Sequence, residues 1–470
     1  NSTKGTTTDF DGNYQIEVKK GDVLLFSYVG FATQVVIINN QKELNISLVE
    51  DLNKLDEVVI VGYGTQKKSH LTGSISKVVN EGLDQIATAR VDDALVGQVS
   101  GVNIQSTEGD AGSAPTIRIR GTGSLAGSSS PLIVVDGLAV DEDFLGSLDM
   151  NDVDSFEVLK DAASSAIYGS RGANGVIMIT TKKGKEGKTK FSFNTFTGRK
   201  EARQSEAYYF SVKDEVAREL ADTGTLSNRA RYIQLLGIDN DWQNIIFDGG
   251  IINNFAFSAR GGSERTKFSV SLGYSQDEGV LIIDDYKKYN GRISIDSKLS
   301  DKFTIGGTFS PSYTNRVRFD GSTHDILRQS PWLPLYLDEH SIQFVNRLRE
   351  NGRWANAQIG DYAEQRMFDD FDLNSMMPVA SGGTDISDTS NTNPAAKVLE
   401  RDRRDLKFKL FGNFYAQYNI TKDLTFRGSI GGDFQNTNNR RFIGEKSNNI
   451  GPSAIELTQA DENVIHIVTE

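Results

Sequence analysis

The residues of this chain that could do chemistry are mainly arginines and carboxylates. Arg118, Arg120 and Arg171 lie in glycine-rich surroundings, and the first two alternate with Ile117 and Ile119. A guanidinium binds a carboxylate through two parallel hydrogen bonds, and a buried guanidinium without a partner is costly. These arginines are therefore candidates for ion pairs in an interior, although Arg171 could equally lie at a surface.

No set of residues in the sequence resembles a catalytic centre. The densest acidic cluster, Asp369, Asp370 and Asp372, has no paired base and no metal motif beside it, so a solvated loop is the favoured interpretation over calcium binding or catalysis. The chain has no cysteine, and its 4 histidines lack metal-ligand spacing. We therefore expect no enzyme activity, no metal and no cofactor.

Length and charge narrow the class of protein. The 470 residues suggest about three domains, and the formal net charge of −12 argues against nucleic acid as a partner. No apolar run approaches the roughly 20 residues that a transmembrane helix needs. Membrane β-strands are not excluded by this, because only every second residue of such a strand faces lipid.

The elements that must position these residues begin with a β-rich region over residues 1–50. Period-2 alternation and turn signals predict a small β-sandwich there. Its predicted strands are Tyr14–Val18, Val23–Tyr28, Ala32–Ile38 and Leu44–Leu48. Residues 51–68 form a hinge that contains Asp56–Tyr63, a segment of high β-propensity. This segment is either a central strand of a neighbouring domain or an unpaired strand that adds to a partner's sheet.

Residues 69–185 predict a compact α+β unit. Its second half has a strand at Thr116–Gly121, a wholly apolar strand at Leu132–Asp136 and a strand at Val153–Leu159. A short helix over Lys160–Tyr168 and a strand over Gly175–Thr181 follow.

Beyond Lys190 the sequence changes to long strands with apolar residues at alternate positions. Seven are predicted, at Lys190–Arg199, Asn253–Gly261, Lys267–Ser275, Tyr289–Leu299, Lys302–Tyr313, Leu406–Ile420 and Leu424–Phe434, with an eighth starting at Val464. Short connections such as Ser300–Asp301 alternate with long ones such as Asn315–Asp405. This alternation is typical of an outer-membrane β-barrel, in which periplasmic turns are short and external loops are long.

Four sequence blocks carry a family resemblance. They read LDEVVIVGYGTQKK, IRIRG, PLIVVDG and FEVLKDAASSAIYGSRGANGVIMITTKKG, in that order between Leu55 and Gly184. They resemble the plug of SusC-type TonB-dependent outer-membrane transporters. The run TDFDGNYQIEVKKGDVLLFSYVGF is similar to the carboxypeptidase-regulatory-like domain of such proteins, without its first strand or a signal peptide.

The resemblance implies a mainly β protein with four parts. These are a regulatory-like β-sandwich (1–50), a TonB box and hinge (51–68), a plug (69–185) and the first strands of a transmembrane antiparallel β-barrel (186–470). Plugged barrels of this kind need about 22 strands. We therefore expect this chain to be the amino-terminal part of a longer protein in the outer membrane, with its first domain in the periplasm.

The same resemblance assigns partners and sites. It implies energy coupling by TonB with ExbB–ExbD, a SusD-like surface lipoprotein, and an oligosaccharide or peptide cargo. The TonB-binding residues would be Asp56, Glu57, Val58, Val59, Ile60, Val61, Gly62 and Tyr63. Plug–barrel pairing would use Arg118, Arg120 and Arg171, with Arg118 and Arg120 largely buried. Substrate or lid contacts would be Glu108, Asp110, Trp332, Tyr336, Trp354 and Tyr362.

Three alternatives stay open at this point. Packing inside a loop would explain the four aromatic residues almost as well as stacking on sugar rings. A signalling receptor would report occupancy through its first domain, but that domain looks like a regulatory-type sandwich. A passive barrel would need neither a plug nor a coupling strand.

Overall fold

The computed structural model divides the chain into two compact units, Asn1–Ser74 and Ile75–Glu470. It describes residues 5–9, 12–27, 34–39, 43–48, 58–61, 64–67, 75–80, 82–83, 86, 88–105, 110–123, 128–202, 211–388, 393–422, 424–447 and 455–469. No helix in these ranges is long and apolar enough to cross a membrane.

In its described residues, the first unit contains two small antiparallel sheets. One pairs β1 (Val23–Phe26) with β2 (Gln34–Ile37), and the other pairs β3 (Val58–Val61) with β4 (Gly64–Lys67). The strands predicted at 14–18 and 44–48 are wrong, since neither segment joins a ladder. A side-chain hydrogen bond joins the two segments instead, since the Tyr14 hydroxyl donates to the Leu44 carbonyl at 2.7 Å.

The plug opens the second unit and is built on a five-stranded sheet in the order β5-β10-β11-β8-β9. These strands are β5 (Ile75–Val79), β8 (Leu132–Val135), β9 (Leu138–Val140), β10 (Val153–Leu159) and β11 (Val176–Thr181). A separate hairpin-like pair joins β6 (Val102–Gln105) to β7 (Thr116–Ile119). The predicted helix at 160–168 is present as α2 (Ala162–Ser165) followed by a 3₁₀ segment (Ala166–Gly172), and Gly169 at φ 59° interrupts the helical backbone within that segment.

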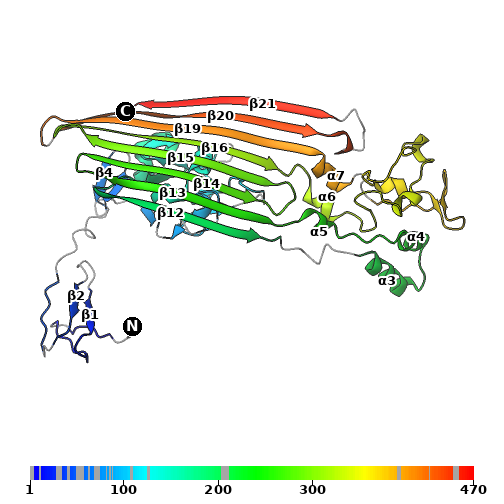
Figure 1. Ribbon diagram of the computed structural model, residues 1–470, viewed down its shortest axis with the longest axis horizontal. Coiled ribbons are helices and arrows are strands. Elements are labelled where there is room, and N and C mark those ends of the chain that lie inside the picture. The colour runs from blue at the N-terminus through cyan, green and yellow to red at the C-terminus, as the bar shows by residue number, and fades with distance from the viewer. Residues whose placement is uncertain are drawn as a thin grey trace. The chain divides into compact units, whose positions relative to one another are not determined.

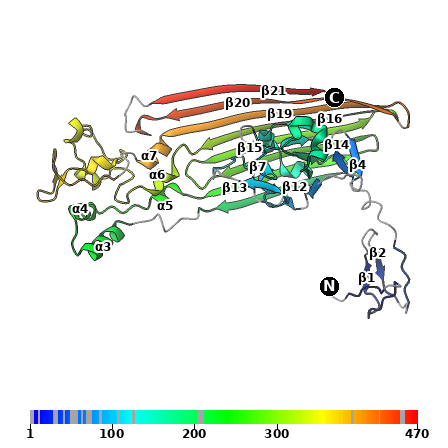
Figure 2. The same cartoon turned by 180° about the vertical axis from the view of Figure 1, so that it is seen from behind.

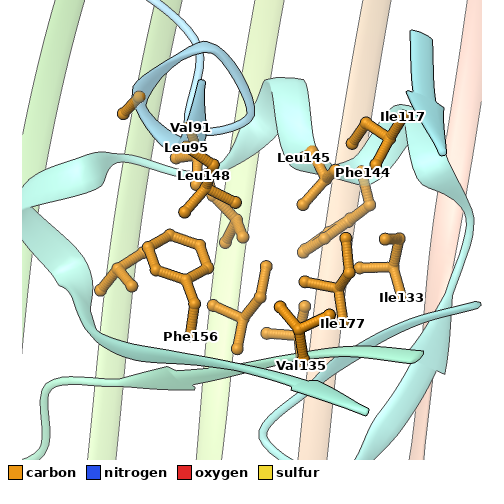
Figure 3. Close-up of a cluster of buried hydrophobic side chains, with 14 of the residues drawn as sticks. Val91, Leu95, Ile117, Ile133, Val135, Phe144, Leu145, Leu148, Phe156 and Ile177 are labelled. Atoms are coloured by element: carbon orange, nitrogen blue, oxygen red, sulfur yellow. The ribbon is translucent and has the colours of Figure 1, made fainter. Parts of the chain in front are cut away.

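The plug's hydrophobic core lies between the sheet and the 3₁₀ segments that cover it (Figure 3). Strands β8 and β11 are nearly continuous apolar runs, whereas β10 also carries Asp154, Ser155 and Glu157. Val135, Phe156 and Ile177, one from each strand, are completely buried. The covering 3₁₀ helices are Asp93–Leu95, Glu142–Ser147 and Met150–Asp152. Strand β11 is central in the sheet and buried on both faces, so it lacks polar alternation.

The barrel wall is one eight-stranded antiparallel sheet (Figures 1 and 2). In order along the sheet, its strands are β12 (Gly187–Lys200), β13 (Gly250–Gly262), β14 (Thr266–Glu278), β15 (Asp285–Lys298), β16 (Phe303–Arg318), β19 (Arg401–Asn419), β20 (Thr425–Ile443) and β21 (Glu456–Thr469). All eight predicted strands are present, but β20 and β21 extend further than expected. Their added ends are mostly polar, with Phe442, Ile443 and Leu457 as isolated large apolar residues, so hydrophobic alternation could not mark them.

Two rows of aromatic side chains cross the outward face of this wall. One row consists of residues paired directly across strands, Phe255, Tyr274, Tyr289, Tyr313 and Phe408. The other consists of Phe303, Tyr418 and Phe426. The rows are ten residues apart on β16 (303 to 313), which is about 25 Å for strands that rise 3.3 Å per residue and tilt by about 40°. This is the height of an outer-membrane apolar band with its aromatic girdles.

The long connections at the opposite end from the short turns fold into a loop module with its own core (Figure 1). Its helices are α3 (Val212–Thr223), α4 (Asn228–Leu236), α5 (Trp242–Ile246), α6 (Thr323–Leu327) and α7 (Pro394–Leu399). Its remaining short elements are β17 (Phe371–Asp372), β18 (Met377–Pro378) and the 3₁₀ helices Ser341–Phe344, Arg349–Asn351, Gln365–Phe368 and Glu445–Ser447. Ser211 and Ser227 cap α3 and α4 by accepting from the first-turn amides.

Candidate functional site between the plug and the barrel wall

Of the three plug arginines singled out from the sequence, Arg120 lies where it was not expected. Arg118 is half-buried, and its guanidinium donates to the Ile117 carbonyl at 2.8 Å and to the Ser130 hydroxyl at 3.4 Å. Arg120 and Arg171 are exposed, so the expected burial of Arg120 is wrong. Strand β7 ends at Ile119, and Arg120 follows at φ 56°, outside the alternation that would have turned it inward. Pairing of these arginines with a barrel wall stays a prediction.

The most deeply buried ion pair described between the plug and the wall joins a wall arginine to a plug carboxylate. This is the reverse of the expected pairing, in which the plug supplied the arginines. Arg292 of β15 donates to Asp136, on the β8–β9 turn of the plug, at 2.8 Å, and both side chains are less than a tenth exposed. Asp136 also accepts from the Thr181 amide (3.0 Å) and hydroxyl (2.7 Å). Burial alone would raise the pKa of Asp136, but Arg292 and Thr181 outweigh it and hold the pKa below its usual range.

A second attachment of the plug lies four residues away on the same strand. Lys288 is completely buried, and its ammonium donates to the plug carbonyls of Ala89 (2.6 Å) and Leu148 (2.7 Å). Further along the wall, Arg260 of β13 donates to the Asn151 carbonyl at 3.1 Å and approaches Asp152 at 3.4 Å. Wall cations therefore hold both charged and neutral acceptors of the plug.

The plug loop around Asp110 meets the wall closer to the loop module. Asp110 lies 3.5 Å from Arg316 and 3.7 Å from Arg318. The adjacent Ala111 amide donates to Asp284 at 2.6 Å. Gly112 has φ +66°, and a Cβ there would lie 2.3 Å from the Tyr286 ring. Only glycine lets the loop approach the wall this closely.

The charged contacts between plug and wall have the same polarity. In the contacts of wall cations that the structure describes, the plug supplies carboxylates and carbonyls, and strands β13, β15, β16 and β19 supply the cations, including Lys407 at 2.8 Å from Asp143. The contact between the neutral Ala111 amide and Asp284 is an exception. The parity of residues along the predicted strands indicates these inward-facing wall cations. Arg292 lies three residues after the outward Tyr289 on the strand predicted at 289–299, so its parity placed it on the inner face. Lys288 directly precedes that predicted strand and has the same parity.

The predicted coupling segment is described only in part. Val58–Val61 forms β3 and pairs with β4 along one edge, so it is not the wholly unpaired strand that was expected. Asp56, Glu57, Gly62 and Tyr63 lie outside the described residues. A two-stranded ribbon by itself is marginally stable and leaves one edge of each strand open. That edge can accept a further strand.

Three of the six predicted substrate or lid contacts are structural. Trp332 and Trp354 are 0% and 4% exposed in the core of the loop module, so neither can stack on a ligand in this structure. Tyr336 and Tyr362 are closer to the surface, with ring centroids 4.9 Å apart. Asp110 is committed to the wall arginines, and Glu108 lies outside the described residues.

Asp369, in the predicted acidic loop, is also structural. It is 1% exposed and accepts from the Ile386 and Ser387 amides, both at 2.9 Å, while Arg349 lies 3.0 Å away. It therefore closes the base of a loop instead of facing solvent. Asp141, Asp433 and His466 also lie close together between plug and wall. Asp141 and His466 are exposed to solvent, whereas the ligands of a structural metal site are enclosed.

An α+β plug pinned to the inner face of an antiparallel wall with two aromatic rows defines a plugged outer-membrane barrel receptor. The model of the TonB-dependent Receptor Plug Domain matches residues 67–176, and that of the CarboxypepD_reg-like domain matches residues 1–60.

Individual relatives are consistent with this class. The TonB-dependent receptor P26 of Formosa agariphila is 33% identical over 96% of this chain and 42% of its own length. The TonB-dependent receptor SusC of Bacteroides thetaiotaomicron is 31% identical over 92% and 42%. Among solved structures, the RagAB peptide importer in its open-open state has a TM-score of 0.63 and 26% identity over 82% of this chain and 43% of the matched chain. The chain thus spans about two fifths of the length of these relatives. It belongs to the SusC-type TonB-dependent receptors.

Proposed function

We propose that the whole protein imports a nutrient across the outer membrane by TonB-dependent active transport. The cargo that we propose is an oligosaccharide, bound beneath a SusD-like surface lipoprotein that covers the loop module. The observation that carries the proposal is the fastening of the plug by buried cations of the wall.

The energy of this fastening argues for an external energy source. Breaking one partner out of a buried ion pair costs about 3–5 kcal/mol. The pair between Arg292 and Asp136 and the contacts of Lys288 must both be lost before the plug can leave this face of the wall. Coupling between a bound ligand and a distant site is typically about 1–3 kcal/mol, which is too little to displace the plug. Cargo binding can therefore report occupancy to the periplasmic side, but displacement of the plug from the wall requires a pulling force.

The force would enter through β3. The edge of the β3–β4 ribbon offers main-chain groups for β-augmentation by TonB, which ExbB–ExbD would energise from the inner membrane. Signalling to a membrane regulator has no comparable support in the described residues. A peptide importer of the same architecture is the second candidate, and the similarity to the RagAB peptide importer favours it.

The proposal is tested by uptake in cells that express the whole protein. A labelled oligosaccharide that supports growth through this receptor should accumulate in energised cells. Accumulation should fall to background after an uncoupler dissipates the proton-motive force, while surface binding at 4 °C stays unchanged. Uptake that survives the uncoupler would contradict active transport. Accumulation of peptides alone would favour the second candidate.

A further inference from the structure

A row of arginines crosses the inner face of the wall above the plug. Arg318 of β16, Arg403 of β19 and Arg441 of β20 are directly opposite one another in consecutive strand pairs. Side chains of directly paired residues lie about 5 Å apart at Cβ, and like charges in this arrangement are destabilising. Such a row is expected only where carboxylates or a bound anion offset the repulsion between the arginines.

The inward direction of the row follows from its neighbours. Arg316 and Asp405 line a small cavity together with the plug residues Arg90 and Gly112. Arg318 and Arg403 are two positions from Arg316 and Asp405, so they share their face. Arg318 also lies 3.6 Å from Asp405 and 3.7 Å from Asp110 of the plug. The row therefore borders the space between the plug and the loop module.

The two outer arginines have carboxylate partners, and the central one does not. Arg441 donates to Asp320 at 2.7 Å, and Arg318 contacts Asp110 and Asp405. Arg403 is half-buried, and it makes no ion pair or side-chain hydrogen bond with any residue that the structure describes. Its guanidinium, with five N–H donors in a fork, stays available between two other cations.

The surrounding carboxylates are already engaged. Asp320 serves both Arg441 and Arg401, the latter at 4.0 Å, and Asp284 accepts from the Ala111 amide. Glu456 on β21 is exposed and acts on Arg441. The neighbouring Asp402 and Arg404 point to the other face of β19 and pair with each other at 2.7 Å. No described carboxylate is therefore placed to neutralise Arg403.

We propose that this row is a binding site for acidic groups of the cargo, and that the imported oligosaccharide is anionic. Arg403 would bind a carboxylate or sulfate group of the sugar, with Arg318 and Arg441 on either side. A carboxylate and a sulfate both present planar oxygen pairs to a guanidinium fork. The inference rests on the proposed import function and adds the substrate class.

The site is tested with the whole purified receptor in detergent micelles. The probe is an equimolar mixture of acidic tetrasaccharides, one built from galacturonate and one from sulfated galactose, with their methyl-esterified and desulfated counterparts. Saccharides retained by the receptor are identified by mass spectrometry. We expect an acidic member to be retained at least tenfold over its neutral counterpart, and more NaCl should weaken its binding.

The matched variants are Arg403→Gln and Arg404→Gln, which alter adjacent residues on opposite faces of one strand. R403Q should lower retention of the acidic saccharide about tenfold or more, because charge-assisted hydrogen bonds are lost. R404Q should change it less than twofold. Because R403Q also removes a like-charge contact, its unfolding temperature should equal or exceed that of the parent.

Several results would overturn the inference. These are equal retention of the neutral counterparts, retention of no acidic saccharide, retention of acidic peptides alone, or unchanged binding in R403Q. Destabilisation by R403Q would also overturn it, since that would assign Arg403 a structural role. Binding to the purified receptor needs no energy source. A failure here is therefore distinct from uptake that ignores the uncoupler, which would defeat the proposed function.

Discussion

Replacing Arg292 with methionine should loosen the plug more than any other single change to the wall's cations. Arg292 is 3% exposed and donates to Asp136, which is 7% exposed, and to the Thr181 hydroxyl. Removing one partner from a buried pair costs about 3–5 kcal/mol. The Arg292 Nε has no hydrogen-bond partner among the described residues, so the lower end of this range applies.

The measurement is amide hydrogen exchange of β8 and β11 in the whole receptor. A loss of about 3 kcal/mol corresponds to local opening that is about 100-fold more frequent. Arg260→Met is the matched control, since Arg260 is 23% exposed and lies 3.4 Å from Asp152. It should accelerate exchange less than tenfold, as for a partly exposed pair. If the methionine at 292 accelerates exchange no more than the one at 260, the argument from burial is wrong.

A double variant separates the pair from general damage. Asp136 has φ 48°, a conformation that asparagine also tolerates, so Asp136→Asn keeps the turn. Combined with Arg292→Met, it should restore part of the slow exchange, because no unpaired charge is left buried. Simple additivity of the two substitutions would show that the two side chains act independently.

The remaining predictions concern three other places. Gly112→Val should lift the plug loop from Tyr286 and speed exchange of residues 110–114, because its Cβ would lie 2.3 Å from the ring; an unchanged rate would refute this close approach. Trp332→Ala should destabilise the loop module by about 3–5 kcal/mol in chemical unfolding, while the exposed Tyr336→Ala should cost little; equal effects would contradict the assigned core. Burial and then Asp92 raise the pKa of Asp93 to about 6. The folded plug thus binds this proton more tightly than the unfolded chain, and stability falls as the pH rises from about 4 to 6. Asp93→Asn should therefore stabilise the plug at pH 7, with the gain vanishing near pH 4 in thermal unfolding.

Strand periodicity was sufficient to predict the wall and the apolar plug strands. Phe303 and Tyr313 share parity with the other outward apolar residues of β16, so lipid contact left a clear pattern. The ends of β20 and β21 had no such pattern, because most of their residues are polar.

The candidate site was harder to predict, because ion pairing depends on contacts between distant segments. Arg118 and Arg120 were chosen for their alternation, but β7 ends before Arg120, and a chain reversal cannot be seen in alternation alone. Arg292 and Asp136 are 156 positions apart, and no local signal joins them. Trp332 and Trp354 were predicted to contact a ligand because they lie in a long loop, yet that loop has its own hydrophobic core, which contains both side chains.

The central claim, that force enters through β3, is tested most directly by proline substitutions in that strand. In an antiparallel ribbon the N–H groups of adjacent residues point to opposite edges, so Val59 and Ile60 donate one to β4 and one to the open edge. Val59→Pro and Ile60→Pro each remove one donor, whereas Val59→Thr keeps both and is the control. Surface binding and accumulation of the same labelled oligosaccharide are measured side by side in cells with each variant.

We predict normal surface binding in all three variants and background accumulation in at least the proline variant that removes the open-edge donor, with near-normal accumulation in Val59→Thr. Full accumulation in both proline variants would contradict capture of β3 by the energy-coupling protein.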